Sequence, residues 1–150
     1  MNLAAVLHNY VLLSSLAAWG LAQGLKIPLD YLQSRRWNWA LLLSAGGMPS
    51  SHSALVVGAT HAIGLYEGFD SPLFGLAVAI CMIVIYDATG IRRQAGIQAQ
   101  KINVLVDKLL KGHPVSDKQL REVLGHTPLE ALGGLILGLV VTQLLWFIWR

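Results

Sequence analysis

Long apolar segments are the feature that most constrains how this chain can fold. Hydrophobic residues make up 55% of its 150 residues and charged residues only 13%, well below the roughly 25% usual in soluble domains. A helix needs about 20 mostly apolar residues to cross the hydrocarbon core of a bilayer. Four segments approach or meet this length, at 7–25, 49–66, 72–86 and 128–149. We therefore predict an all-α integral membrane protein, a single-domain helical bundle (1–150) with about four transmembrane helices.

Two further segments predict helices that do not cross the membrane. Residues 37–43 are apolar but too short to span it, which indicates a re-entrant or interfacial piece. From 94 to 122, apolar side chains recur at helical spacing and lysines occupy another face. This pattern is typical of an amphipathic helix on a membrane surface or against the bundle. We expect Gly112 and Pro114 to end this helix and 116–119 to begin a short polar one.

The positive charges predict which loops lie on which side of the membrane. Three of the eleven lysines and arginines lie in 26–36 and seven in 92–121, whereas the loop after the second apolar segment carries Glu67 and Asp70. Lysine and arginine mark cytoplasmic loops. We therefore expect both basic stretches in the cytoplasm and both termini outside. The ends of the apolar segments that border these stretches should then share one surface.

The charge distribution and the cysteine content indicate which molecules the chain contacts and whether it forms disulfide bonds. The net charge of +3 is spread along loops beside apolar segments, which indicates contact with anionic lipid headgroups and not with nucleic acid. The single cysteine, Cys81, lies in an apolar segment, so we expect a buried thiol and no intrachain disulfide. The N-terminal segment lacks a basic start and a small-residue cleavage site, so we expect a retained helix.

The sequence Pro49-Ser50-Ser51-His52 opens the second apolar segment. Proline at a first helical position, preceded by two glycines, predicts a tight turn and then a helix N-terminus. Free backbone N–H groups there, together with two serine hydroxyls, favour a bound anion. The alternative is an ordinary capped helix start, with His52 as an interfacial polar residue.

Asp87 closes the third apolar segment and is followed by Arg92 and Arg93. A carboxylate at this boundary would orient one guanidinium group, and an oriented arginine binds phosphate through two hydrogen bonds. The alternative is that the two arginines only anchor the basic loop on the cytoplasmic side.

His126 precedes the fourth segment, and Glu130 follows one helical turn later. At this spacing the carboxylate can accept a hydrogen bond from one imidazole nitrogen and leave the other nitrogen basic. The alternative is a helix start at which Glu130 only favours the positive end of the helix dipole. A metal would need more ligands than this pair offers. We expect the other histidines, among them His61, to be structural or solvent-facing.

These motifs together resemble the phosphatidic acid phosphatase type 2 and vanadium haloperoxidase superfamily. The P-S-S-H sequence at 49–52 is similar to its P-S-G-H motif, and His126-x-x-x-Glu130 is similar to the H-x-x-x-D of its third motif. The runs G-M-P-S-S-H-S-A, Y-D-A and R-R-Q-A-G resemble more closely its divergent branch of small membrane proteins. This likeness extends over 26–138.

The resemblance implies chemical roles. His126 would attack phosphorus and form a phosphohistidine, oriented by Glu130. His52 would protonate the leaving oxygen and later activate water, while Asp87 would orient an arginine. Cations and hydroxyl groups would bind the phosphate oxygens, namely Lys26, Arg35, Ser50, Ser51, Arg92 and Arg93.

The implied function is a membrane phosphatase that hydrolyses a lipid-like phosphate monoester or diphosphate at the cytoplasmic interface, with no metal or cofactor. Its partners would be the lipid phosphate substrate and membrane lipids. A homo-oligomer is left open, because four spans offer little depth for burying such a site. The alternative is a non-catalytic member of the fold that binds anionic lipid headgroups or scaffolds a membrane complex.

Overall fold

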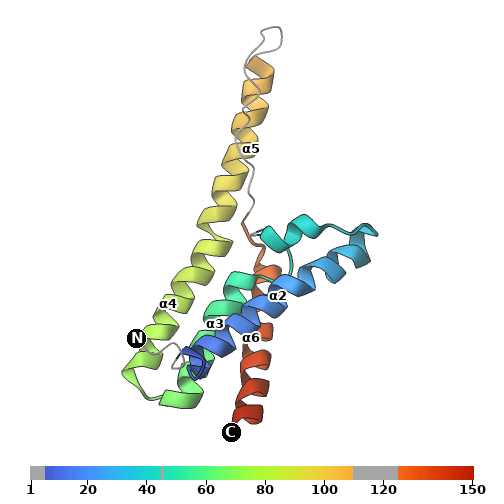
Figure 1. The fold of residues 1–150 in the computed structure, drawn as a ribbon. Coiled ribbons are helices and arrows are strands. Elements are labelled where there is room, and N and C mark those ends of the chain that lie inside the picture. The colour runs from blue at the N-terminus through green and yellow to red at the C-terminus, as the bar shows by residue number, and fades with distance from the viewer. Residues whose placement is uncertain (1–5, 45, 110–124) are drawn as a thin grey trace.

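The computed structural model describes residues 6–44, 46–109 and 125–150, and within these residues the regular structure is entirely helical. Figure 1 shows the chain as a bundle of long helices with one helix that projects from it. The all-α prediction is therefore confirmed. In chain order the elements are α2 (Tyr10–Ser34), the short 3₁₀ helix η1 (Trp39–Leu43), α3 (Ser51–Glu67), α4 (Pro72–Thr89), α5 (Ile91–Leu109) and α6 (Pro128–Trp149).

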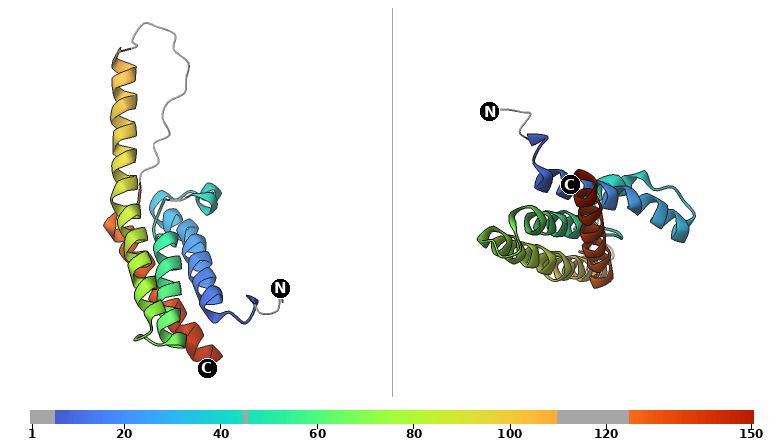
Figure 2. Two further views of the ribbon diagram at one scale, coloured as in Figure 1. Left: turned by 90° about the vertical axis from the view of Figure 1, so that its left-hand side faces the viewer. Right: turned by 90° about the horizontal axis from the view of Figure 1, so that it is seen from below.

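Helix α3 lies at the centre of the bundle and contacts α2, α4 and α6. The start of α2, the turn between α3 and α4 and the end of α6 lie at one end of the bundle (Figures 1 and 2). The starts of α3 and α6 and the end of α4 lie at the other end. The apolar segments predict α3, α4 and α6 closely. Helix α2 continues to Ser34, well beyond the end predicted at 25.

The outer surface of the bundle is apolar, as a membrane protein requires. Large hydrophobic side chains are strongly exposed on α4 and α6, for example Ile83 at 68% and Phe147 at 65%. Such exposure is typical of a face that meets lipid or a partner. Two helical stretches, Pro72–Val106 and α6, are each long and apolar enough to cross a membrane. These features confirm the predicted class, an integral membrane helical bundle.

Helix α5 forms where the sequence predicts an amphipathic helix, but it takes a different direction. It continues the line of α4 away from the bundle (Figures 1 and 2). Its only strong contact with another described element is with α4. The reason lies at Gly90, whose N–H donates to the carbonyl of Tyr86 and whose carbonyl accepts from Gln94. Helical hydrogen bonding therefore runs almost unbroken from α4 into α5. The predicted end at Gly112 and the helix at 116–119 lie outside the described residues.

Small side chains allow α2, α3 and α6 to pack closely. Ala18 and Ala22 of α2 are fully buried in one cluster with Ala54 of α3 and Val141 of α6. Helices in a bilayer associate through this kind of close contact, because lipid provides no hydrophobic driving force between them. The buried hydroxyl of Thr142 adds a hydrogen bond of 3.3 Å to the Gly58 carbonyl of α3.

Two glycines set the distance between α6 and α3. A Cβ atom at Gly134 would overlap the carbonyl oxygen of Ser50, and one at Gly138 would lie 2.8 Å from the carbonyl oxygen of Ala54. Neither position leaves room for a side chain. The two glycines are one helical turn apart, so they form a flat stripe that lets α6 lie against the backbone of α3.

This packing predicts the effect of adding one methyl group. Gly134→Ala should destabilise the bundle by about 1–3 kcal/mol, the usual cost of overpacking, because the Ser50 carbonyl belongs to a rigid helix start. The matched control is Gly133→Ala, where the new Cβ would lie 3.5 Å from Met48 and Pro49 atoms, an ordinary contact. Thermal unfolding in detergent should show a lower Tm only for Gly134→Ala. Equal Tm values for the two variants would contradict the proposed packing.

Candidate functional site

Backbone hydrogen bonds bring the three polar motifs together at one end of the bundle. The N–H of Ser50, at the start of α3, donates to the carbonyl oxygen of Glu130 in α6 at 2.9 Å. The N–H of His126 donates to the carbonyl oxygen of Ala88, beside Asp87 in the last turn of α4, at 3.0 Å. Segments far apart in the sequence thus meet on one surface, as the alternation of apolar and basic stretches predicts.

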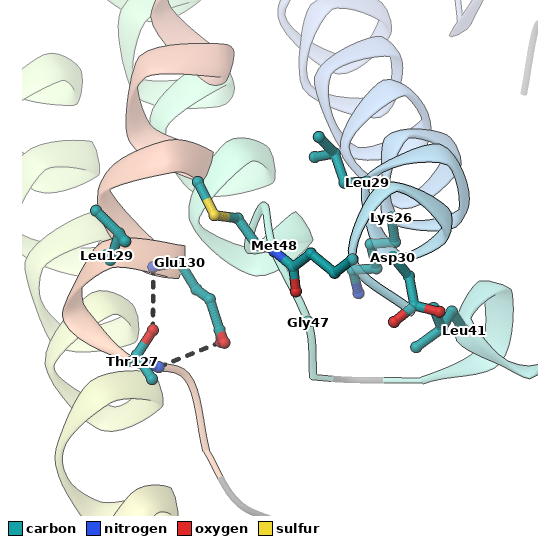
Figure 3. A pocket seen from close by; sticks show the side chains of 10 residues that line it. Lys26, Leu29, Asp30, Leu41, Gly47, Met48, Thr127, Leu129 and Glu130 are labelled. Carbon is teal, nitrogen blue, oxygen red and sulfur yellow. Dashed lines mark hydrogen bonds between the residues drawn. The ribbon is translucent and has the colours of Figure 1, made fainter. Parts of the chain in front are cut away.

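The Glu130 carboxylate orients the His126 imidazole. His126 Nδ1 lies 3.0 Å from Glu130 Oε2, and because a carboxylate only accepts, Nδ1 carries the hydrogen. The same oxygen accepts the N–H of Thr127 at 3.2 Å, while the Thr127 hydroxyl accepts the N–H of Glu130 (Figure 3). This reciprocal pair is a capping box, which fixes the first turn of α6. Glu130 therefore both caps its helix and holds the imidazole.

The second imidazole nitrogen of His126, Nε2, has a different environment from Nδ1. The side chain is only 4% exposed, and Nε2 makes no hydrogen bond within the described residues. Since Nδ1 carries the hydrogen, Nε2 holds a free lone pair. Buried polar atoms without partners are rare, so each one calls for an explanation. A nucleophile or a ligand-binding group is such an explanation.

His52 lies close to His126. It is in the first turn of α3, is half-buried, and its ring centroid is 5.9 Å from that of His126 with the planes tilted by 60°. The two imidazoles therefore lie next to each other where α3 and α6 begin. This arrangement suits two groups that act on opposite sides of one reacting atom.

Lys26 carries a positive charge into the same region. Its side chain is 1% exposed, and Nζ donates to the Ser44 carbonyl at 2.9 Å and to the Ser51 hydroxyl at 3.5 Å. The Glu130 carboxylate attracts this ammonium group electrostatically. A buried charge needs such partners to offset the loss of hydration. The long extension of α2 beyond the predicted span thus positions Lys26 beside the starts of α3 and α6.

The segment after α2 is held in place by Gln23. Its amide nitrogen donates to three carbonyl oxygens at the end of η1, those of Leu41, Leu42 and Ser44, at 3.2, 2.7 and 3.2 Å. Gln23 lies one turn before Lys26, so both side chains reach the same loop. None of the five residues of η1 is buried. This agrees with the interfacial piece predicted for 37–43.

A pocket of about 240 Å³ opens between α2 and the start of α6, as Figure 3 shows. Lys26 and Glu130 belong to different sides of it. No histidine is among the described residues that line it, so both imidazoles lie outside its wall. Its remaining lining residues are Leu29, Asp30, Gln33, Leu41, Gly47, Met48, Thr127 and Leu129.

The other expected phosphate ligands are placed less closely. Arg35 is exposed at the end of α2, nine residues and therefore about 13 Å beyond Lys26 along the helix, and it does not line the pocket. Arg92 and Arg93 begin α5, but their side chains lie outside the described part of the structure. Asp87 is half-buried in the last turn of α4. Phosphate binding by Arg35, Arg92 and Arg93 and the orienting role of Asp87 stay predictions.

The sequence motifs do not predict several polar groups of this site. Thr127 could have been found, because Thr127-Pro128-Leu129-Glu130 has the spacing of a capping box. Gln23 and the Ser44 carbonyl carry no comparable signal, since their contacts depend on how the loop after α2 folds back. No three His, Cys, Asp or Glu side chains of the described residues are grouped closely enough to hold a metal ion.

The fold and this polar junction define an integral membrane protein with phosphatase-like motifs. Residues 7–141 match the family described as "Divergent PAP2 family", and the chain belongs to this family. The chain is also similar to the "Uncharacterized membrane protein YuiD" of Bacillus subtilis (strain 168), with 41% identity over 151 residues, covering 93% of this chain and 96% of that protein. No solved structure matches it.

A phosphate analogue should stabilise this site through Lys26. Orthovanadate should raise the Tm of the detergent-solubilised protein, because a ligand that binds only the native state stabilises it, by about 2.7 kcal/mol at 100 times its Kd. Lys26→Gln should abolish this increase, measured against the variant's own Tm without ligand. Arg36→Gln is the matched control, because Arg36 is an exposed cation beyond α2. Equal protection of both variants would show that Lys26 does not bind the anion.

Proposed function

We propose that this protein is a membrane phosphatase that hydrolyses a phosphate monoester or diphosphate of a lipid-like substrate. Membership of the Divergent PAP2 family supports a phosphatase-related role in a membrane. The observation that carries the proposal is the state of His126. Glu130 binds its Nδ1, while Nε2 is buried with no partner among the described residues. An oriented imidazole with one free nitrogen has the form of an activated nucleophile.

In the first step His126 Nε2 attacks phosphorus, and the bond from phosphorus to the leaving oxygen breaks. His52 donates a proton to that oxygen, so an alcohol or a phosphate leaves. Glu130 stabilises the positive charge that develops on the His126 ring, as the buried carboxylate of a catalytic triad does. In the second step water attacks phosphorus, His52 accepts its proton, and the phosphorus–nitrogen bond breaks. His126 then recovers its lone pair and inorganic phosphate is released.

The surrounding charges favour this chemistry. Phosphoryl transfer depends mostly on positioning and on groups that neutralise the phosphate oxygens. Lys26 supplies a buried ammonium group that already contacts the Ser51 hydroxyl. The N-terminus of α3, which begins at Ser51, adds the positive end of a 17-residue helix dipole. We propose that Arg92 and Arg93, which are close in sequence to the end of α4, complete the set of cations.

The rim of the pocket supports a lipid-like substrate. Apolar side chains of Leu41, Met48 and Leu129 line it beside Lys26 and Glu130. Met48 is 41% exposed and Leu129 is 63% exposed, so part of the apolar rim lies on the outer surface of the bundle. A phosphate group could bind at the polar side while its hydrocarbon chain stayed in the bilayer.

We also propose that the end of the bundle that carries this site faces the cytoplasm, because ten of the eleven lysines and arginines lie in the stretches 26–36 and 92–121, which adjoin in sequence the helix ends found there. With Cys81→Ala as background, a cysteine at Gln33 should be shielded from an impermeant thiol reagent added to intact cells. A cysteine at Asp70, at the opposite end, should be labelled. Labelling of the cysteine at Gln33 and not of the one at Asp70 would reverse this orientation.

The second candidate is a non-catalytic protein that binds anionic lipid headgroups through the same pocket. One observation favours it: the pocket is lined by Lys26 but by neither histidine, and His126 is 4% exposed. Such a protein would bind phosphate and vanadate but would release no phosphate from any lipid.

Phosphate release from a panel of phospholipid and prenyl phosphates by the purified protein separates the two candidates. The wild type should turn over at least one of them, and His126→Ala should lower kcat by at least 10³-fold, because the substitution removes the proposed nucleophile. His8→Ala is the matched control at the far end of the bundle and should retain wild-type activity. No turnover by the wild type, or equal turnover by His126→Ala, would favour the non-catalytic candidate.

Substitutions of His52 and of Glu130 should affect kcat in different ways. His52→Ala should mainly slow substrates whose leaving group needs a proton, so a phosphate ester with a good leaving group should partly restore kcat. Glu130→Gln should reduce kcat strongly, since an amide does not stabilise the charge on the imidazolium. Glu130→Asp, which keeps the charge on a shorter side chain, should be milder. If Glu130→Gln were as active as the wild type, the carboxylate would serve only as a helix cap.

A further inference from the structure

A second polar pair lies away from the candidate site, in the apolar part of the bundle. His61 of α3 and Gln143 of α6 are joined by a contact of 3.0 Å between Nε2 and Oε1. His61 lies ten residues beyond Ser51, and Gln143 lies thirteen beyond Glu130. These separations place the pair about 15–20 Å along the helices from the phosphate site. The pair therefore takes no part in the chemistry proposed above.

The hydrogen bonds of this pair are incomplete. Gln143 Oε1 only accepts, so His61 Nε2 carries the hydrogen and His61 Nδ1 is left as an acceptor. The amide nitrogen of Gln143 brings two N–H donors. Within the described residues, neither Nδ1 nor this amide nitrogen has a hydrogen-bond partner. Hydrocarbon offers none either, and polar groups that lack partners inside a membrane are costly.

These unpaired groups open to the outside of the bundle. His61 and Gln143 line an open groove of about 350 Å³ together with Leu139, Val140 and Leu144. The three apolar residues are on the exposed face of α6, and Leu144 is 56% exposed. The groove therefore combines an apolar surface with one acceptor and two donors.

We propose that this groove is an intramembrane interface with a second copy of the same chain. The unpaired groups of one copy are complementary to those of another, because each copy offers amide donors and an imidazole acceptor. Around a twofold axis, Gln143 of each copy can donate to His61 of the other, and the apolar residues of the two α6 helices pack around this contact. An acyl chain would fill the groove but would leave all of these groups without partners.

Cysteine cross-linking in native membranes tests this interface directly. With Cys81→Ala as background, Leu144→Cys should form a disulfide-linked dimer under mild oxidation. Leu76→Cys is the matched control, because Leu76 of α4 is 57% exposed, also a leucine, and near the same end of the bundle. It should form little or no dimer. Equal cross-linking of the two, cross-linking of Leu76→Cys alone, or none at all would overturn the proposal.

The polar contact is tested by Gln143→Met, which removes the amide and keeps a side chain of similar length. In the Leu144→Cys background it should lower the dimer yield about tenfold, the effect expected for loss of two interhelical hydrogen bonds. An unchanged yield would show that the pair does not hold the copies together.

A further measurement determines the number of copies per complex with the wild-type protein, without any substitution. Fluorescently labelled wild-type protein, diluted into lipid vesicles, should bleach mainly in two steps as a dimer. Single-step bleaching, with an amphiphile found bound to the monomer by native mass spectrometry, would assign the groove to a lipid. None of these three experiments measures phosphate release, so failure of the proposed function would leave their results unchanged.

Discussion

The close contact between the first turns of α3 and α6 is the constraint on which the site depends. The Ser50 N–H donates to the Glu130 carbonyl, and Gly134 leaves no room for a Cβ beside the Ser50 carbonyl. This contact places the imidazole of His52, in the first turn of α3, and that of His126, just before α6, with ring centroids 5.9 Å apart. A larger residue at Gly134 would separate the two rings even if every polar side chain were retained. Close packing by small residues thus determines the geometry of the polar site.

Glu130 links the stability of a helix start to the orientation of a reactive group. One carboxylate oxygen accepts from both the Thr127 N–H and His126 Nδ1, so the capping interaction and the tautomer of the imidazole depend on the same atom. Lys26 of α2 approaches the same carboxylate and is otherwise satisfied by a loop carbonyl and a hydroxyl group. Three helices therefore meet around a small set of opposite charges, and His126 Nε2 is buried beside them without a hydrogen-bond partner within the described residues.

The sequence predicts the helices and their convergence well, because apolar length and charge asymmetry are local properties. It predicts the His126–Glu130 pair for the same reason, since four residues make one helical turn. It does not predict that α2 continues to Ser34, because Lys26 is tolerated there only through contacts with Ser44 and Ser51. The direction of α5 was also beyond prediction, since it depends on whether Gly90 interrupts the helix. The grooves and pockets likewise depend on packing between segments that are distant in sequence.

The central claim is that His126 Nε2 acts as a nucleophile toward phosphorus, and detection of a covalent phosphate on this residue tests it most directly. The purified protein would be mixed with a lipid phosphate that it hydrolyses, quenched in base, which preserves phosphohistidine, and analysed by mass spectrometry. The account predicts one phosphoryl group on His126, which accumulates in His52→Ala, where hydrolysis of the intermediate is slowed, and is absent from His126→Ala. Turnover without covalent phosphate, or phosphate on a different residue, would contradict it.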